Sequence, residues 1–225
     1  YVFMATSMGT VKKTALDEFN NPRKGGIIAV NLDEGDYLIG AALTDGKHDV
    51  MLFSDGGKAV RFDENDVRPL GRSARGVRGM MLEDGQGVIA MLVAGDEQQS
   101  VLTATQNGYG KRTSITEYTR HGRGTKGMIA IQQSERNGKV VAATLVHVDD
   151  EIMLITDKGV LVRTRVSEIR ELGRATQGVT LIGLDEGSKL SGLQRIVEND
   201  ANAGADDDSS GAADGQGDTG DTTTP

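Results

Sequence analysis

The sequence predicts an all-β protein built from repeated units, like the blades of a β-propeller. Composition is the first reason, since 31 glycines, only 3 prolines and 37% hydrophobic residues favour short strands joined by tight turns. The second is a set of glycines that recur about every fifty residues: Gly9, Gly57, Gly108 and Gly159, then Gly26, Gly76, Gly127 and Gly178, then Gly35, Gly85, Gly138 and Gly187. The first series is spaced by 48, 51 and 51 residues and the second by 50, 51 and 51. A period of this size is typical of propeller blades.

The second repeat shows the expected strands most clearly. We expect residues 50–53 and 59–62 to form a hairpin around Ser54–Gly57, where glycine supplies the positive φ of the turn. Residues 76–82 and 88–93 read as two further strands separated by a second turn. Four such strands in each repeat give four blades, which we place at residues 1–48, 49–100, 101–150 and 151–197. Blades of this kind bury their faces only against their neighbours.

Charge is distributed unevenly between this body and the C-terminal end. The net charge is −8, but residues 198–225 contain 8 of the 33 acids and no Lys or Arg. Residues 1–197 therefore hold 25 acids against 25 bases. Because residues 198–225 consist mainly of Gly, Ala, Asp, Ser and Thr, they are predicted to be an acidic disordered tail.

Several classes of protein are disfavoured by composition alone. The absence of cysteine excludes disulfides, thiolate zinc sites and cysteine nucleophiles, and favours a cytoplasmic location. No apolar run approaches the roughly 18 residues of a transmembrane helix, so no membrane association is expected. The chain begins at Tyr1 within an apolar stretch, which suggests that the N-terminus is truncated.

A basic residue stands four positions after the first glycine of every repeat, as Lys13, Arg61, Arg112 and Arg163. Lys12 and Lys111 precede two of them. A single cation on a strand is usually a solvated side chain or a guard against edge aggregation. Four in register instead predict a curved band of positive charge on one rim, which suits the backbone of bent DNA.

A second basic cluster precedes the second glycine series. Small residues between the bases would let backbone amides approach phosphate oxygens, so we favour phosphate binding over an ordinary polar loop. Together, the cations predicted to contact DNA are Lys12, Lys13, Arg23, Lys24, Lys58, Arg61, Arg72, Arg75, Arg78, Lys111, Arg112, Arg123, Lys126, Arg163, Arg165 and Arg174.

No residue pattern predicts catalysis or metal binding. One acid recurs in each connector, as Glu18, Asp66, Glu117 and Glu168, and we interpret it as capping a short helical turn. Carboxylates on separate blades cannot form the close pair that glycoside hydrolysis requires. The glycine pattern at residues 122–127 lacks a βαβ context, and the three histidines lack metal-ligand spacing. Aromatic residues at 4%, without tryptophan, disfavour stacking on single-stranded nucleic acid.

Three segments give the sequence a specific resemblance. Residues 103–113 (TATQNGYGKRT), 156–159 (TDKG) and 162–169 (VRTRVSEI) resemble the C-terminal domain of DNA gyrase A, in the type IIA topoisomerase family. Residues 4–6 and 9–14 fit the same pattern, so the resemblance covers nearly all of residues 1–197. It implies a β-pinwheel, a six-bladed relative of the propeller with strands exchanged between blades, of which this chain is an incomplete part.

The resemblance also implies a function for the parent protein. That protein would be an ATP-dependent type II DNA topoisomerase, an isomerase, whose basic perimeter wraps duplex DNA to support negative supercoiling. Its partners would be gyrase B and a second copy of gyrase A, in an A2B2 heterotetramer on the nucleoid. This chain would use no cofactor, because ATP and Mg2+ act elsewhere in the parent. The family's basic Gln-Arg-Arg-Gly-Gly-Lys-Gly box and the catalytic tyrosine domain are absent, so the fragment alone is expected to bend DNA without supercoiling it.

Two other interpretations remain open. The C-terminal domain of the A protein of topoisomerase IV shares this type of blade, although the regular repeats and the acidic tail favour gyrase. A protein-interaction propeller of the WD-repeat or kelch kind is the other, but the missing tryptophan and the cations in register argue against it.

Overall fold

The computed structural model describes residues 1–197, so the predicted acidic tail lies outside the described residues. The described chain contains strands and short 3-10 helices only, which confirms the all-β prediction. The strands are β1 (Val2–Thr6), β2 (Thr10–Thr14), β3 (Leu38–Leu43), β4 (Asp49–Ser54), β5 (Lys58–Asp63), β6 (Val77–Arg78), β7 (Val88–Ala94), β8 (Ser100–Thr105), β9 (Tyr109–Ser114), β10 (Met128–Ile129), β11 (Val140–Val146), β12 (Glu151–Thr156), β13 (Leu161–Arg165), β14 (Val179–Thr180) and β15 (Leu190–Ile196). The 3-10 helices are η1 (Leu16–Phe19), η2 (Glu64–Asp66), η3 (Ile115–Glu117) and η4 (Val166–Glu168). Within residues 1–197 no helix is long and apolar enough to span a membrane.

The strands form four antiparallel sheets, which we call blades 1 to 4. Their strand orders are β3-β1-β2-β6, β10-β5-β4-β7, β11-β8-β9-β14 and β13-β12-β15. Each of the short strands β6, β10 and β14 pairs with the blade before its own repeat, which is the strand exchange of a pinwheel. The expected third strand is thus present in the second, third and fourth repeats, although only two of its residues pair, whereas the first repeat has no strand between β2 and β3.

Two of the glycine series mark places where the backbones of successive repeats nearly touch. Gly57 has φ +82°, and a Cβ atom there would lie 2.6 Å from the carbonyl oxygen of Ile131 in the next repeat. Gly127 has φ +76°, and its Cβ would lie 2.4 Å from the carbonyl oxygen of Ala59. Only glycine combines a positive φ with the absence of Cβ, so strand exchange explains why these glycines recur.

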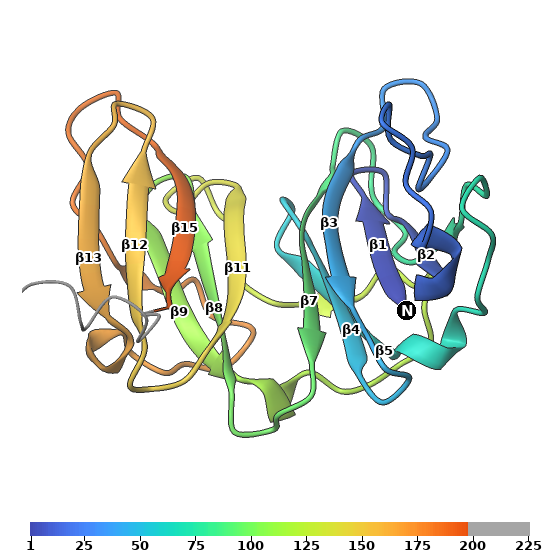
Figure 1. Cartoon of the computed structure of the whole chain (residues 1–225). Coiled ribbons are helices and arrows are strands. Elements are labelled where there is room, and N and C mark those ends of the chain that lie inside the picture. Colours follow the sequence, from blue (N-terminus) through green and yellow to red (C-terminus); the bar gives the residue numbers. More distant parts are fainter. Residues whose placement is uncertain (198–225) are drawn as a thin grey trace, which may run out of the picture.

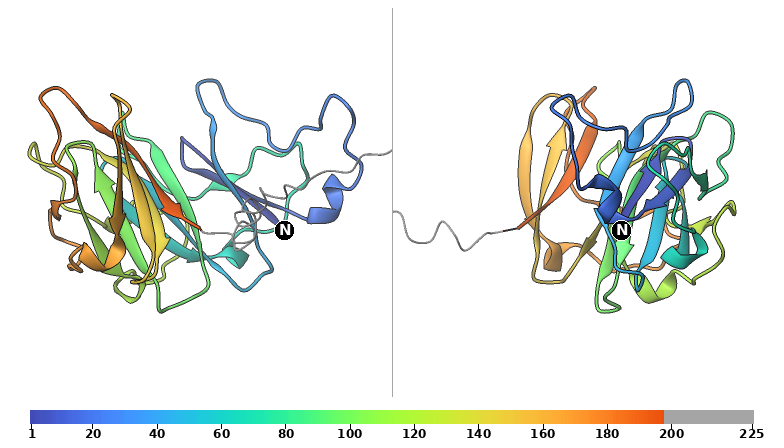
Figure 2. Two further views of the ribbon diagram at one scale, coloured as in Figure 1. Left: turned by 60° about the vertical axis from the view of Figure 1, so that its left-hand side comes forward. Right: turned by 45° about the vertical axis from the view of Figure 1, so that its right-hand side comes forward.

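The blades form an open arc (Figure 1). The strands β3, β7, β11 and β15 line its inner side and contact one another in that order, as two further views also show (Figure 2). Three apolar clusters fill the spaces between blades, with Phe3 and Leu52 in the first, Phe53 and Ile115 in the second, and Leu102 and Leu154 in the third. Each blade is therefore stabilised mainly by burial of apolar surface against its neighbours.

Candidate nucleic-acid interface

Three of the four cations in register, Lys13, Arg61 and Arg112, lie between blades, where each one reaches the 3-10 helix of the next blade. Lys13 is buried, and its Nζ lies 3.1 Å from Glu64 Oε2 and donates to Asn65 Oδ1 at 3.0 Å. Both partners belong to η2 of blade 2. We call Lys13, Arg61 and Arg112 the seam cations.

Arg61 and Arg112 repeat this arrangement one and two blades further along. Arg61 donates from Nη1 to the carbonyl oxygens of Ile115 and Tyr118, at 3.0 and 3.2 Å, around η3. Its Nε donates to Asp49 Oδ2 at 2.7 Å, and its Nη2 pairs with Glu97. Arg112 donates from Nε to the carbonyl oxygen of Ile169, just after η4, at 2.8 Å.

Two further lysines are enclosed by carbonyl oxygens. Lys12 donates to the carbonyl oxygens of Ala29, at 2.6 Å, and Arg72, while Lys111 donates to those of Gly173 and Arg174. Burial lowers the pKa of Lys111 to about 8, with Glu117 opposing and Arg174 reinforcing the shift. Lys12 is shifted downward by burial in the same way, so its pKa also lies below the ordinary value.

These positions correct the predicted band of surface charge. Lys12, Lys13, Arg61 and Lys111 are buried, and Arg112 is half-buried and paired with Glu171 at 3.2 Å. The prediction that they lie on an exposed rim is wrong for the four buried residues. The physical reason is that the exchanged strand and the next 3-10 helix cover this edge of each blade, and neither can be recognised from one repeat alone. Arg163 has the same position in blade 4, where it is exposed and pairs with Glu151 of its own blade.

The second basic cluster lies on the outer side of the arc, in the connections that lead into β6, β10 and β14. We call residues 71–78, 122–129 and 173–180 the perimeter loops. In each, one arginine donates from Nη1 to a carbonyl oxygen of the preceding repeat: Arg72 to Ile28 at 2.9 Å, Arg123 to Arg78 at 3.0 Å and Arg174 to Ile129 at 2.7 Å. The three carbonyls occupy equivalent positions. A carbonyl partner orients a guanidinium but leaves its positive charge unneutralised.

Two of the four recurring acids, Glu18 and Glu117, position these loops, and the acids do not cap their own turns as expected. Glu18 Oε2 accepts the backbone N–H of Arg72, and Glu117 Oε2 accepts that of Arg174, both at 3.1 Å. The side chains that cap η2 and η3 belong instead to Asp63 and Ser114. The predicted short helical turns are confirmed, whereas the predicted capping by their own acids is wrong.

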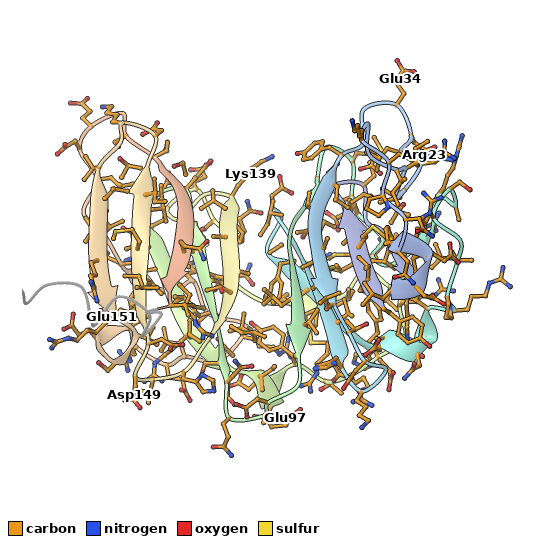
Figure 3. The ribbon with its side chains drawn as sticks, viewed as in Figure 1. Arg23, Glu34, Glu97, Lys139, Asp149 and Glu151 are labelled. Atoms are coloured by element: carbon orange, nitrogen blue, oxygen red, sulfur yellow. The ribbon has the colours of Figure 1, made fainter. Side chains whose placement is uncertain are left out.

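The other predicted contact residues remain at the surface. Arg23, Lys24, Arg78, Lys126 and Arg165 are exposed, and Figure 3 shows Arg23 projecting from the first repeat. Three more form surface ion pairs, namely Arg75 with Asp33, Lys58 with Glu83 and Arg163 with Glu151. Exposed ion pairs contribute only about 0–1 kcal/mol, so a phosphate can compete for these cations.

One surface arginine, Arg120, was missed by the sequence reasoning because it belongs to no repeated position. It is about half exposed and pairs with Asp49 at 2.7 Å and with Asp63 at 3.4 Å. Near it, a hollow of 380 Å³ is lined partly by His121, Gly122, Thr125 and Lys126. The perimeter loop at residues 122–129 thus combines exposed cations with backbone that a phosphate oxygen can approach.

Asp45, His48 and Glu64 form a cluster whose ligand atoms lie within 4.8 Å of one another. Glu64, however, already accepts the backbone N–H groups of Gly46 and His48, both at 2.9 Å, and pairs with Lys13. Burial acts to raise the pKa of Glu64, but these hydrogen bonds, that of Thr44 and the Lys13 charge together lower it to about 2. We therefore assign this cluster to the seam between blades 1 and 2 and not to a metal.

Comparison with known proteins identifies the family. Residues 1–45, 48–94, 99–147 and 150–196 match the model of the DNA gyrase C-terminal domain, described as a β-propeller. The chain belongs to this family. DNA gyrase A from Pseudomonas aeruginosa is 53% identical over 208 residues, and that from Salmonella typhimurium is 56% identical over 197 residues. These matches cover 92% and 88% of this chain but only 22% of each gyrase A protein, so the chain is a fragment relative to them.

Solved structures confirm the pinwheel fold of this gyrase-family chain. The C-terminal domain of a DNA topoisomerase IV superposes with a TM-score of 0.83 at 27% identity, covering 87% of this chain and 61% of the other. The C-terminal domain of a DNA gyrase A gives 0.79 at 27% identity, covering 88% and 66%. The resemblance seen in the sequence is thereby confirmed. Gyrase is favoured over topoisomerase IV by the identities above 50% to gyrase A proteins.

Proposed function

We propose that the chain binds duplex DNA along its perimeter loops and bends it around the outer side of the arc. The observation that carries this proposal is the threefold repetition of an arginine held by a carbonyl oxygen in equivalent loops, Arg72, Arg123 and Arg174. Cations that are oriented but not neutralised, spaced along a convex edge, suit a phosphate backbone that follows a curve. Arg23, Lys24, Arg78, Lys126 and the ion-paired surface cations extend the same edge.

Energetics require these contacts to act together. Bending 20–30 bp smoothly by 40–90° costs on the order of 1–6 kcal/mol, so one phosphate contact per blade is insufficient unless several blades engage one duplex. The buried seam cations support the proposal indirectly, because they hold neighbouring blades in register and thereby set the curvature of the perimeter. DNA contact by the exposed and half-exposed predicted residues stays part of the proposal.

Within the longer parent protein, we propose that this bending is the wrapping step of an ATP-dependent gyrase. Gyrase B and a second copy of gyrase A would be its partners on the nucleoid, with ATP and Mg2+ used outside this chain. The fragment would supply DNA geometry and no catalytic group. Sequence identity to gyrase A proteins supports gyrase over topoisomerase IV as the parent.

A binding experiment with duplexes of increasing length tests the proposal. The affinity for one binding site should climb with duplex length up to roughly 20–30 bp if the duplex follows the arc, and should not change with length if contact is confined to one loop. The double variant Arg78→Ala with Lys126→Ala, both exposed in the perimeter loops, should lose affinity for every sequence alike. Lys47→Ala is the matched control, since Lys47 is exposed but lies outside the perimeter loops. Equal losses in both variants would contradict a perimeter site.

A further inference from the structure

Two exposed cations lie at the tight turn between β8 and β9 of blade 3, and both are held by uncharged groups. The guanidinium of Arg136 lies over the ring of Tyr109, with its Cζ 4.7 Å from the ring centroid. Lys189 Nζ donates to Asn107 Oδ1 at 2.6 Å. Within residues 1–197 neither cation pairs with a carboxylate, so both keep their positive charge. We call Asn107, Tyr109, Arg136 and Lys189 the turn cluster.

The equivalent of the first cation is neutralised in blade 2. Tyr109 corresponds to Lys58, since each follows the first glycine of its repeat, and Arg136 corresponds to Glu83, since each stands two residues before the third glycine series. Lys58 and Glu83 form an ion pair at 2.9 Å. Blade 3 instead pairs a guanidinium with an aromatic ring, which attracts it through the ring quadrupole but carries no net charge. The charge of Arg136 is therefore oriented without being cancelled.

The second cation shows the same contrast. Lys139 and Lys189 each stand immediately before the inner strand of their repeat and reach back to the tight turn of the preceding blade. Figure 3 shows Lys139 at this edge, at the start of β11. Lys139 Nζ pairs with Asp55 Oδ2 at 2.9 Å, whereas Lys189 reaches the amide oxygen of Asn107. Equivalent turns thus hold an equivalent lysine, but only the turn of blade 2 neutralises it.

Asn107 also fixes the backbone that carries Arg136. Its Nδ2 donates to the carbonyl oxygens of Glu135 and Arg136, at 3.1 and 3.0 Å. On the other side of the turn, Asp157 Oδ1 accepts the backbone N–H of Lys189 at 2.9 Å. One amide side chain therefore anchors both cations in place, and a ligand that meets them has little side-chain ordering left to induce.

The turn cluster borders the perimeter loop at residues 173–180. Tyr109 pairs with Thr180 of β14, the last residue of this loop. The same loop holds Arg174, whose guanidinium is oriented by the carbonyl oxygen of Ile129. A duplex that follows the perimeter loops around the arc therefore passes beside the turn cluster at blade 3.

We propose that the turn cluster binds phosphates of the DNA backbone, as a second contact of blade 3 beside its perimeter loop. This inference rests on the proposed function, because it names a further site on the same duplex. Phosphate fits the cluster because Arg and Lys donate charge-assisted hydrogen bonds to its oxygens, and no carboxylate has to be displaced first. Phosphate contacts set the orientation of a duplex and not its sequence, so the turn cluster would fix the tilt of the DNA at blade 3.

Lys189→Ala and Lys139→Ala test the proposal as a matched pair. Both remove one exposed lysine immediately before an inner strand, and the two lysines differ in their partner. With the full chain and a duplex of about 30 bp, Lys189→Ala should lower the slope of log affinity against log salt by about 0.9, the value for one lost phosphate contact. Lys139→Ala should leave the slope unchanged, because Asp55 already balances that charge. Arg136→Ala should behave as Lys189→Ala does.

Asn107→Asp tests the uncharged partner without removing a cation. It gives Lys189 the kind of partner that Lys139 has, so the slope should fall as it does in Lys189→Ala. Asn107→Ser is the control, because it also loses the hydrogen bonds from Nδ2 but adds no charge, and it should keep the slope of the unchanged chain. Urea unfolding of both variants shows whether they fold equally well.

Equal slopes in Lys189→Ala and Lys139→Ala would overturn the inference, and so would equal slopes in Asn107→Asp and Asn107→Ser. The double variant Arg78→Ala with Lys126→Ala separates these outcomes from failure of the proposed function. If that variant loses affinity and the turn-cluster variants do not, the turn cluster alone is wrong. Loss in the turn-cluster variants alone would contradict the perimeter loops and leave the turn cluster as the DNA site. An unchanged chain that binds no duplex DNA would overturn both proposals.

Discussion

Arg61 and Arg72 lie eleven residues apart, yet their guanidinium groups have opposite surroundings. Arg61 is buried in a seam, where Asp49 and Glu97 neutralise it and two carbonyl oxygens of blade 3 orient it. Arg72 lies in a perimeter loop and donates to the Ile28 carbonyl oxygen, which carries no formal charge. The comparison shows that a cation in register is informative about function only once its partner is known. Seam cations hold blades together, and perimeter cations remain available to phosphate.

The largest expected effect is on stability, from truncating a seam cation. Arg61→Ala leaves Asp49 buried with only Arg120 beside it, so the free energy of unfolding should fall by about 3 kcal/mol. Urea unfolding followed by circular dichroism measures this loss. DNA affinity of the folded protein should change little. A stability loss below about 1 kcal/mol, in the range of surface ion pairs, would place Arg61 with the perimeter cations instead.

The seam between blades 1 and 2 should make the protein sensitive to acid. The pKa of Glu64 is about 2 in the folded chain against 4.5 ordinarily, so its contribution is present above pH 4.5 and is lost as pH falls towards 2. We expect this loss to be about 2–3 kcal/mol. Between pH 6 and pH 2 the free energy of unfolding should fall less steeply with pH in Glu64→Gln than in the unchanged protein. The variant should also be less stable at pH 6. Equal slopes in the two proteins would show that the Lys13–Glu64 pair is not coupled to folding.

The buried charge of Lys111 should destabilise the fold, and this destabilisation should be relieved at alkaline pH. Because its folded pKa of about 8 lies below the ordinary 10.5, the unfolded chain binds more protons between these values, and stability should rise with pH across this window. The expected gain is on the order of 2 kcal/mol and should vanish in Lys111→Met. Thermal unfolding at pH 7.5, 9 and 10 measures it. A wild-type profile that falls like that of the variant would contradict a buried, destabilised ammonium.

The smallest expected effects distinguish a perimeter cation that would contact only DNA from one that would also stabilise the fold. Lys126→Ala should lower the slope of log affinity against log salt by about 0.9 while changing stability by less than about 0.5 kcal/mol. Arg72→Ala should lower the slope similarly and also destabilise the chain, because the Ile28 carbonyl loses its partner. Filter binding across a salt series, paired with urea unfolding, resolves the two. Identical stabilities would show that the hydrogen bond from Arg72 to the Ile28 carbonyl oxygen does not stabilise the fold.

Much of the architecture could be predicted from local features. Glycines at equal spacing, hairpin turns and short apolar runs indicated four repeats of strands, because tight turns and apolar runs are properties of a few neighbouring residues. The strand of each repeat expected at residues 76–82 and its equivalents was also recognisable. Its partner was not, because pairing Val77 with Val11 joins residues 66 positions apart and the two-residue ladder is too short to leave a pattern.

The candidate site divides in the same way. The sequence alone showed that cations recur at equivalent positions of the repeat. Lys13, Arg61, Arg112 and Arg163 are in register, and arginines precede the second glycine series. Which of those charges are exposed depended on the packing of the blades. The neighbouring blades that decide this are formed by residues about fifty positions away in the sequence. They cover one cation with a carboxylate and leave another at the surface beside a carbonyl oxygen.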